Sequence, residues 1–130
     1  MDYQISDEYR ELAETVIGER EDLAWIRSAG VRIDYVTSLK EKKSGNRCVH
    51  AECKKINDFQ QVYCPYDFVI VIYLPNVAHM SVEQKKILLW HELLHIDFRE
   101  GDSGTRFCIR HHDIEDFKTI IRQYGLDWSE

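Results

Sequence analysis

Apolar positions in the first part of the chain recur at the spacing of an amphipathic helix. In residues 7–27 they fall every three or four positions, at Tyr9, Leu12, Ala13, Val16, Ile17, Leu23 and Ile26. This period predicts a helix that is capped by Ser6 or Asp7 and finished before Gly30. The polar stretch 18–22 interrupts the pattern, so we expect two short helices there.

The pattern then changes to the alternation that is typical of β-strands. Residues 31–36 alternate apolar and polar positions, which predicts a half-buried strand. The turn sequence at 44–46 separates them from a second run at 48–56, which we expect to pair with the first as a hairpin. Residues 68–74 are continuously β-branched and aromatic, which predicts a central strand buried on both faces.

Helical spacing returns in the last third of the chain. Ser81 and Gln84 have the spacing of a capping box, and the helix that they open is expected to run to about residue 98. A loop at 100–104 and a last helix at about 112–124, closed by Gly125, follow. This order predicts a single α+β domain over residues 1–130. Its small, mostly antiparallel sheet of about three strands packs with an N-terminal helix, the helix after Ser81 and the C-terminal helix.

Composition and charge narrow the classes of partner. The formal net charge is −6, which disfavours nucleic acid as a partner. The lysines between residues 40 and 55 lie near Glu41 and Glu52, so we interpret this stretch as a solvated hairpin. There is no apolar run of about 20 residues and no signal peptide, so we expect no membrane partner and a cytoplasmic protein with reduced cysteines. The sequence makes no prediction of oligomeric state.

The sequence His91-Glu92-Leu93-Leu94-His95 carries the clearest chemical signal. Positions i and i+4 of a helix lie one turn apart on one face, so both imidazoles can reach one ion. Zinc accepts imidazole nitrogen, and a catalytic zinc keeps one coordination position open for water. Glu92 follows His91 directly and projects near the edge of the metal-binding face, so it can act as the general base that takes a proton from the activated water. The motif therefore predicts one Zn²⁺ per chain, held by His91 and His95.

A catalytic zinc site needs a third protein ligand, which must come from beyond the helix. We expect His112 to supply it, because this residue begins the last predicted helix and can point back toward the preceding one. His111, Glu115 and Asp113 are the alternatives, in that order. The acidic residues in this stretch also suit the N-terminus of a helix, whatever the function.

The cysteines suggest a second, structural zinc site. Its ligands would be Cys48, His50, Cys53 and Cys64. The spacing lacks a CxxC knuckle, and on a strand Cys53 points away from the face that Cys48 and His50 share. We therefore expect ordinary thiols at these positions.

With these motifs the chain resembles the metallopeptidases of phages and prophages. The matching pieces are residues 65–68, the motif helix at 89–96, the stretch 112–117 and the ending 124–128, so the resemblance covers about residues 31–128. It implies a zincin-like fold and supports His112 as third ligand. A looser likeness to SprT-like proteases is architectural, because no cysteine-rich zinc ribbon follows Cys108 and the charge is −6.

Together these features predict a zinc-dependent metallopeptidase that acts on a peptide or protein in the cytoplasm of a bacterium or a phage-infected host. The alternative is a zinc-containing protein of phage or prophage origin that binds or regulates a partner without catalysis. Glu92 discriminates between the two, because a structural zinc site has no need of a general base and closes its fourth position with protein.

Overall fold

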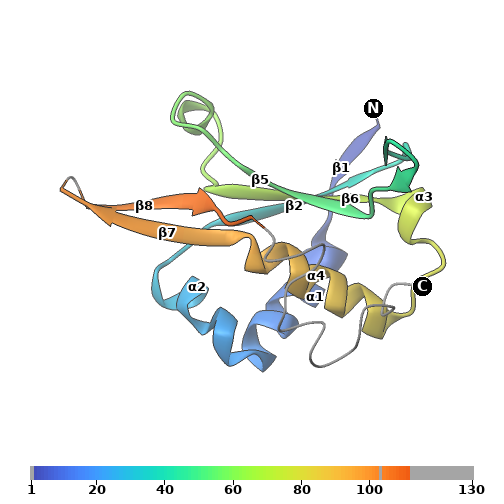
Figure 1. Cartoon of the computed structure of the whole chain (residues 1–130), viewed down its shortest axis with the longest axis horizontal. Coiled ribbons are helices and arrows are strands. Elements are labelled where there is room, and N and C mark those ends of the chain that lie inside the picture. The colour runs from blue at the N-terminus through green and yellow to red at the C-terminus, as the bar shows by residue number, and fades with distance from the viewer. Residues whose placement is uncertain (1, 103, 112–130) are drawn as a thin grey trace.

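The computed structural model describes residues 2–102 and 104–111, which form an α+β fold. The helices formed by residues 7–28 and 82–94 lie on one face of a four-stranded sheet, so these elements form two layers (Figure 1). The strands follow the order β1 (Tyr3–Ile5), β2 (Ile33–Ser38), β6 (Phe68–Tyr73) and β5 (Ala51–Lys55). β2 and β6 run parallel, whereas β1 and β5 lie antiparallel to their neighbours.

The central position of β6 follows from its composition. Phe68, Ile70 and Ile72 are fully buried on the helix side, and Val71 and Tyr73 are also buried on the other face. A strand that is apolar on both faces is most stable with neighbours on both sides, and β6 lies between β2 and β5. The central strand predicted for residues 68–74 is therefore confirmed.

The predicted sheet was wrong in its number of strands and in one pairing. The sheet has four strands and not about three, since the edge strand β1 was not predicted. The turn at Gly45, whose φ is +63°, closes a short hairpin between β3 (Lys43–Ser44) and β4 (Arg47–Cys48). β5 follows this hairpin and pairs with β6 instead of β2. The reason is that both flanking strands gain more by covering the most apolar strand than by pairing with each other.

The N-terminal helices confirm the predicted interruption. α1 (Asp7–Glu19) is capped by Ser6, whose Oγ accepts a hydrogen bond from Tyr9 N at 3.2 Å. The short 3₁₀ turn η1 (Glu21–Leu23) then leads into α2 (Ala24–Ser28). No helix within residues 2–102 and 104–111 has the length and apolar character that a bilayer span requires.

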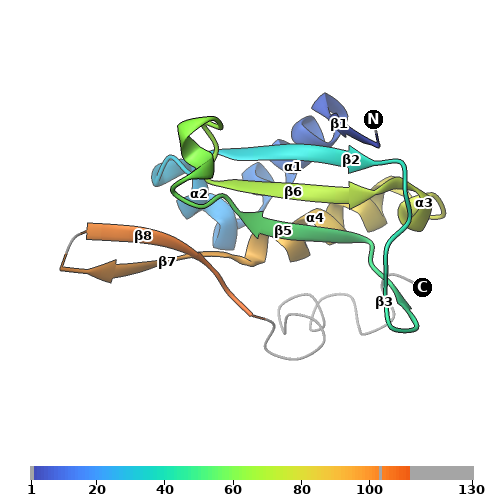
Figure 2. The ribbon, with the colours of Figure 1, turned by 90° about the horizontal axis from the view of Figure 1, so that it is seen from above.

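The motif helix ends earlier than predicted. α4 (Val82–Leu94) begins with the predicted capping box, in which Ser81 and Gln84 bond to each other's backbone N–H. Instead of continuing to about residue 98, the chain enters a hairpin of β7 (Ile96–Gly101) and β8 (Gly104–Ile109). This hairpin projects beyond the four-stranded sheet (Figure 2). The helix predicted at 112–124 lies outside the described residues.

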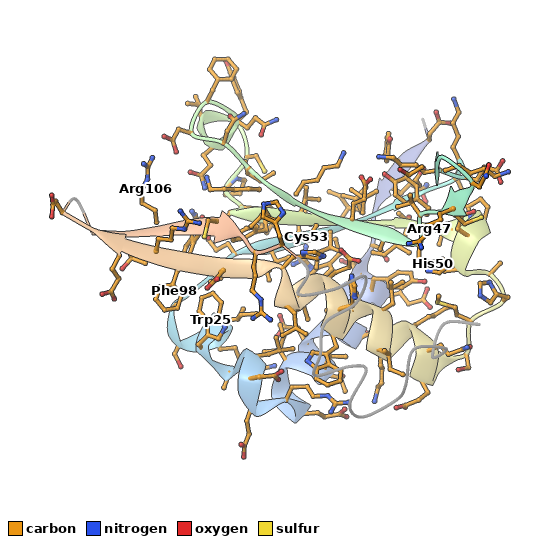
Figure 3. All side chains as sticks on the ribbon, viewed as in Figure 1. Trp25, Arg47, His50, Cys53, Phe98 and Arg106 are labelled. Atoms are coloured by element: carbon orange, nitrogen blue, oxygen red, sulfur yellow. The ribbon has the colours of Figure 1, made fainter. Side chains whose placement is uncertain are left out.

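An aromatic contact between α2 and β7 supports the hairpin of β7 and β8. The centroids of Trp25 in α2 and Phe98 in β7 are 5.1 Å apart, and Figure 3 shows the two side chains facing each other.

Two short helical elements flank β6, namely η2 (Gln60–Val62) before it and α3 (Leu74–Val77) after it.

Asp67 joins three segments just before β6, and its loss should be costly. Its carboxylate is buried and accepts hydrogen bonds from Arg32 N at 2.9 Å, Arg32 Nη2 at 3.2 Å and Gln61 Nε2 at 3.0 Å. Because hydrogen bonds to charged groups contribute about 1.5–3 kcal/mol, we expect Asp67→Ala to lower the free energy of unfolding by roughly that amount. Urea denaturation measures the loss, and Asp102→Ala in the exposed hairpin turn is the control. Equal stabilities of the two variants would contradict this role.

Candidate metal centre

The sequence of α4 divides the helix into a core face and a face toward β5. Leu89 and Leu93 are completely buried in the core between the sheet and α1. His91 and His95 lie one turn apart and are partly exposed. The helical period thus fixes the leucines in the core and brings both imidazoles to the edge of the sheet that β5 forms.

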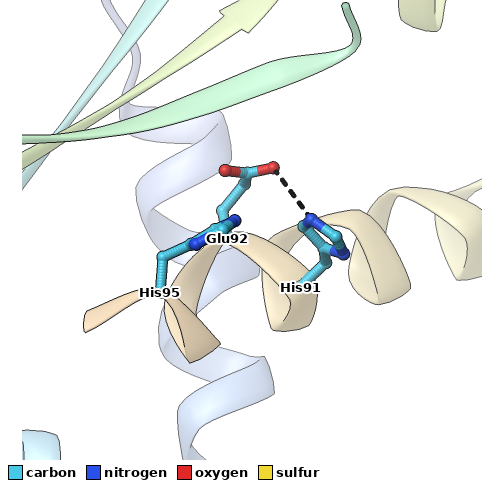
Figure 4. Close-up of side chains that lie close together, drawn as sticks. All are labelled: His91, Glu92 and His95. Atoms are coloured by element: carbon cyan, nitrogen blue, oxygen red, sulfur yellow. Dashed lines mark ion pairs between the residues drawn. The ribbon is translucent and has the colours of Figure 1, made fainter. Parts of the chain in front are cut away.

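His91, Glu92 and His95 form a compact group of possible metal ligands. One ligand atom from each residue lies within 4.8 Å of the others. The two imidazole rings have centroids 5.2 Å apart and planes inclined by 72°. His91 Nε2 is 3.9 Å from Glu92 Oε2 (Figure 4). The arrangement is that of two imidazole nitrogens beside a carboxylate, which suits a divalent cation.

A hydrogen bond fixes the orientation of His95. Its Nδ1 lies 2.7 Å from the carbonyl oxygen of Arg110, just after β8. A carbonyl can only accept, so Nδ1 carries the proton and the lone pair of the neutral ring is on Nε2. Metal-binding histidines commonly donate their other ring N–H in this way. The residues therefore fit a metal that binds imidazole nitrogen.

Glu92 is nearly enclosed by protein. Its side chain is only 5% exposed, and its carboxylate points toward β5 in Figure 4. Burial, and then the nearby Glu92 carboxylate, raise the pKa of the Cys53 thiol in β5. The carboxylate thus lies between the two possible ligands on α4 and the edge strand.

These side chains line a cavity of about 570 Å³ between α4 and the edge of the sheet. The helix contributes His91, Glu92 and His95, and β5 contributes the opposite wall with Ala51, Glu52, Cys53 and Lys54. Lys42, Ile109 and His111 complete the lining. The cavity therefore gives a molecule from solvent access to the histidine pair.

The structure tests the predicted ligands only in part. It brings His91, Glu92 and His95 together as predicted, but His112, Asp113 and Glu115 lie outside the described residues. His111, the first alternative for the third ligand, lines the same cavity. The stretch in which the third ligand was predicted therefore begins beside the histidine pair.

Sequence reasoning missed two lysines of the cavity wall. Lys42 and Lys54 were assigned to a solvated hairpin, yet both line the cavity. The alternation of Glu52 and Lys54 with the less polar Ala51 and Cys53 was the available signal, since it indicates a strand with one polar face. Only the pairing with β6 shows that this strand lies beside the motif helix.

Cys48, His50, Cys53 and Cys64, the alternative zinc ligands considered above, do not form a group of candidate metal ligands in the described part of the chain. Within the described ranges, the group of three or more candidate ligands that comes together is His91, Glu92 and His95. His50 instead lies near His79, with ring centroids 6.0 Å apart. Burial, and then the nearby His79 and His91, lower the pKa of His50.

The comparisons with known proteins agree with this geometry. A family model described as "Putative phage metallopeptidase" matches residues 1–130. No curated protein and no solved structure matches the chain.

Proposed function

The chain belongs to this phage metallopeptidase family, and we propose that it is a zinc-dependent peptidase whose single domain spans residues 1–130. The observation that carries the proposal is the convergence of His91, Glu92 and His95 in one cavity. The Nδ1 hydrogen bond of His95 supports it further, because it leaves Nε2 as the nitrogen that can bind a metal.

We propose His91, His95 and His112 as the residues that hold the zinc ion. Zinc at such a site supplies Lewis acidity, which polarises a peptide carbonyl and lowers the pKa of water. Three protein ligands leave one coordination position open, as this chemistry requires. The position of His111 in the cavity wall supports a third ligand from the stretch that follows β8.

Glu92 is the proposed general base. Its carboxylate accepts a proton from the water molecule that attacks the peptide carbonyl carbon. The same carboxyl group then gives the proton to the amine that leaves as the C–N bond breaks. Its enclosure between α4 and β5 holds it beside the ligands in one orientation.

The edge of β5 is the proposed docking site for an extended substrate. β5 pairs with β6 on one side and is the last strand of its sheet on the other. An extended peptide can add to such an edge through backbone hydrogen bonds. Because β5 also forms one wall of the cavity, a peptide added there passes the histidine pair. Efficient cleavage of folded helical segments, but of no extended peptide, would contradict this arrangement.

Metal content is the direct test of the proposed site. We expect one zinc ion per chain in the wild type and in Glu92→Gln, and an affinity at least about 10–100-fold lower in His95→Ala and His112→Ala. Mass spectrometry of metals after dialysis against a weak chelator measures both. His79→Ala is the control, since His79 lies in the loop before α4 and outside the ligand group.

The same measurement separates the two histidine candidates for the third ligand. Loss of zinc in His112→Ala and retention in His111→Ala would support His112, and the reverse would assign His111. A wild-type protein that holds no zinc, even after refolding with the metal, would overturn the peptidase proposal. In that case a non-catalytic binding protein without zinc would take its place, whereas a zinc-loaded protein that cleaves no peptide would support the zinc-containing alternative.

A further inference from the structure

The edge strand β5, which lines the cavity, carries a connected cluster of charged side chains on the face that points away from the helices. Glu52 lies at its centre. Its Oε1 accepts a hydrogen bond from Lys42 Nζ at 2.5 Å, and its Oε2 accepts one from the Tyr73 hydroxyl at 3.1 Å. Lys54 Nζ is 3.6 Å from Oε2, which is longer than a hydrogen bond. One carboxylate thus stands between two ammonium groups.

Glu52 is already engaged and remains ionised. Burial raises its pKa, but the hydrogen bonds from Lys42 and Tyr73 outweigh burial, and the net shift is downward. The Lys42 loop is itself held in place, because Asn76 Nδ2 donates to the carbonyl oxygens of Lys42 and Val49, each at 2.8 Å. The cluster is therefore held in a fixed arrangement, and its two ammonium groups and one carboxylate leave one positive charge in excess.

Lys54 is the member of the cluster that can still bind a ligand. Its side chain is 56% exposed, and its contact with Glu52 is not a hydrogen bond. An ammonium group has three donors, so Lys54 can bind a carboxylate without breaking the bond between Lys42 and Glu52. A basic ligand would meet both ammonium groups and would have to displace them from Glu52.

The alternation of β5 determines which part of a bound peptide meets Lys54. Cys53 points to the helix side, where it senses Glu92, so Glu52 and Lys54 lie on the other face of the strand. Cross-strand neighbours on one face of a sheet have Cβ atoms about 4.5–5.5 Å apart. In a peptide added beside β5, every second side chain would therefore lie next to Glu52 or Lys54, on the face of the sheet away from Glu92.

We propose that β5 selects peptides with an aspartate or glutamate side chain that pairs with Lys54 in the segment lying along this strand. This inference rests on the proposed peptidase function and adds a substrate class to it. Lys54 is a specificity-determining residue in this scheme, and Lys42 supports it by neutralising Glu52.

Cleavage of a random extended-peptide library tests the proposal. Mass spectrometry of the products gives the frequency of each residue around the cut bonds. For the wild type we expect aspartate and glutamate to be enriched about two- to fivefold at one position, the range that a partly exposed ion pair supports. Lys54→Glu should turn the enrichment into a preference for lysine and arginine, and Lys54→Ala should remove it.

Lys43→Glu is the matched control, because Lys43 is exposed on β3 and does not line the cavity. It should keep the acidic preference of the wild type, and equal thermal midpoints of all variants will show that they are folded. Cleavage without acidic enrichment, or enrichment that persists in Lys54→Glu, overturns the substrate class and leaves the peptidase function standing. Zinc-loaded wild type that cuts no peptide overturns the peptidase function itself, and the substrate class with it.

Discussion

Replacing Glu92 with glutamine is expected to lower kcat for peptide hydrolysis by a factor of about 10²–10⁴ without loss of bound zinc. Glutamine has the same size, so it fills the enclosed site between α4 and β5 where Glu92 is 5% exposed. Its amide cannot accept the proton of the attacking water. Turnover of a peptide that the wild type cleaves, measured together with zinc content, checks both parts of the prediction.

Glu83→Gln is the matched control for this experiment, since Glu83 is exposed in the first turn of the same helix. It should keep wild-type turnover. A zinc-loaded Glu92→Gln that retains more than about a tenth of wild-type kcat would exclude Glu92 as the general base. Loss of zinc in this variant would instead make Glu92 a ligand.

Leu89→Ala is expected to lower the free energy of unfolding by roughly 2–5 kcal/mol. Leu89 is 0% exposed in the core beneath the sheet, so alanine leaves a cavity that its neighbours fill only in part. Domains of this size have total stabilities of about 5–15 kcal/mol, which makes the loss a large share of the whole. Urea denaturation of the metal-free proteins measures it.

Val82→Ala provides the comparison on the same helix, because Val82 is 64% exposed. Its stability should stay within about 0.5 kcal/mol of the wild type. Similar losses in both variants would mean that the core face of α4 is not what anchors the metal helix. Since Leu89 faces away from the cavity, folded Leu89→Ala should still bind zinc.

Local patterns predicted the starts of α1 and α4 and the spacing of the candidate ligands on α4. The capping box at Ser81, the spacing of His91 and His95, and the break after α1 all depend on residues within one or two helical turns. Each of these features is decided by neighbours in sequence, so the sequence reveals it directly.

Non-local pairing explains what could not be predicted. Residues 96–98 continue the helical spacing of α4, but their strand conformation is decided by β8, which begins at Gly104. In the same way, β5 joins β6 and not β2, and this choice places Lys42 and Lys54 in the cavity wall. Strand partners distant in sequence leave no periodic signal in either strand.

The hairpin of β7 and β8 is closed at its base by His95 and Arg110. Arg110 N donates to the carbonyl oxygen of His95 at 2.6 Å, and His95 Nδ1 bonds to the carbonyl oxygen of Arg110. The chain leaves the cavity at one of these residues and returns at the other, so the hairpin is a side branch whose length does not set the spacing between them. Sequence added beside Asp102, at the far turn, would lengthen the branch and leave that spacing unchanged. A fluorescent reporter inserted there would follow the protein inside a cell without disturbing the histidine pair.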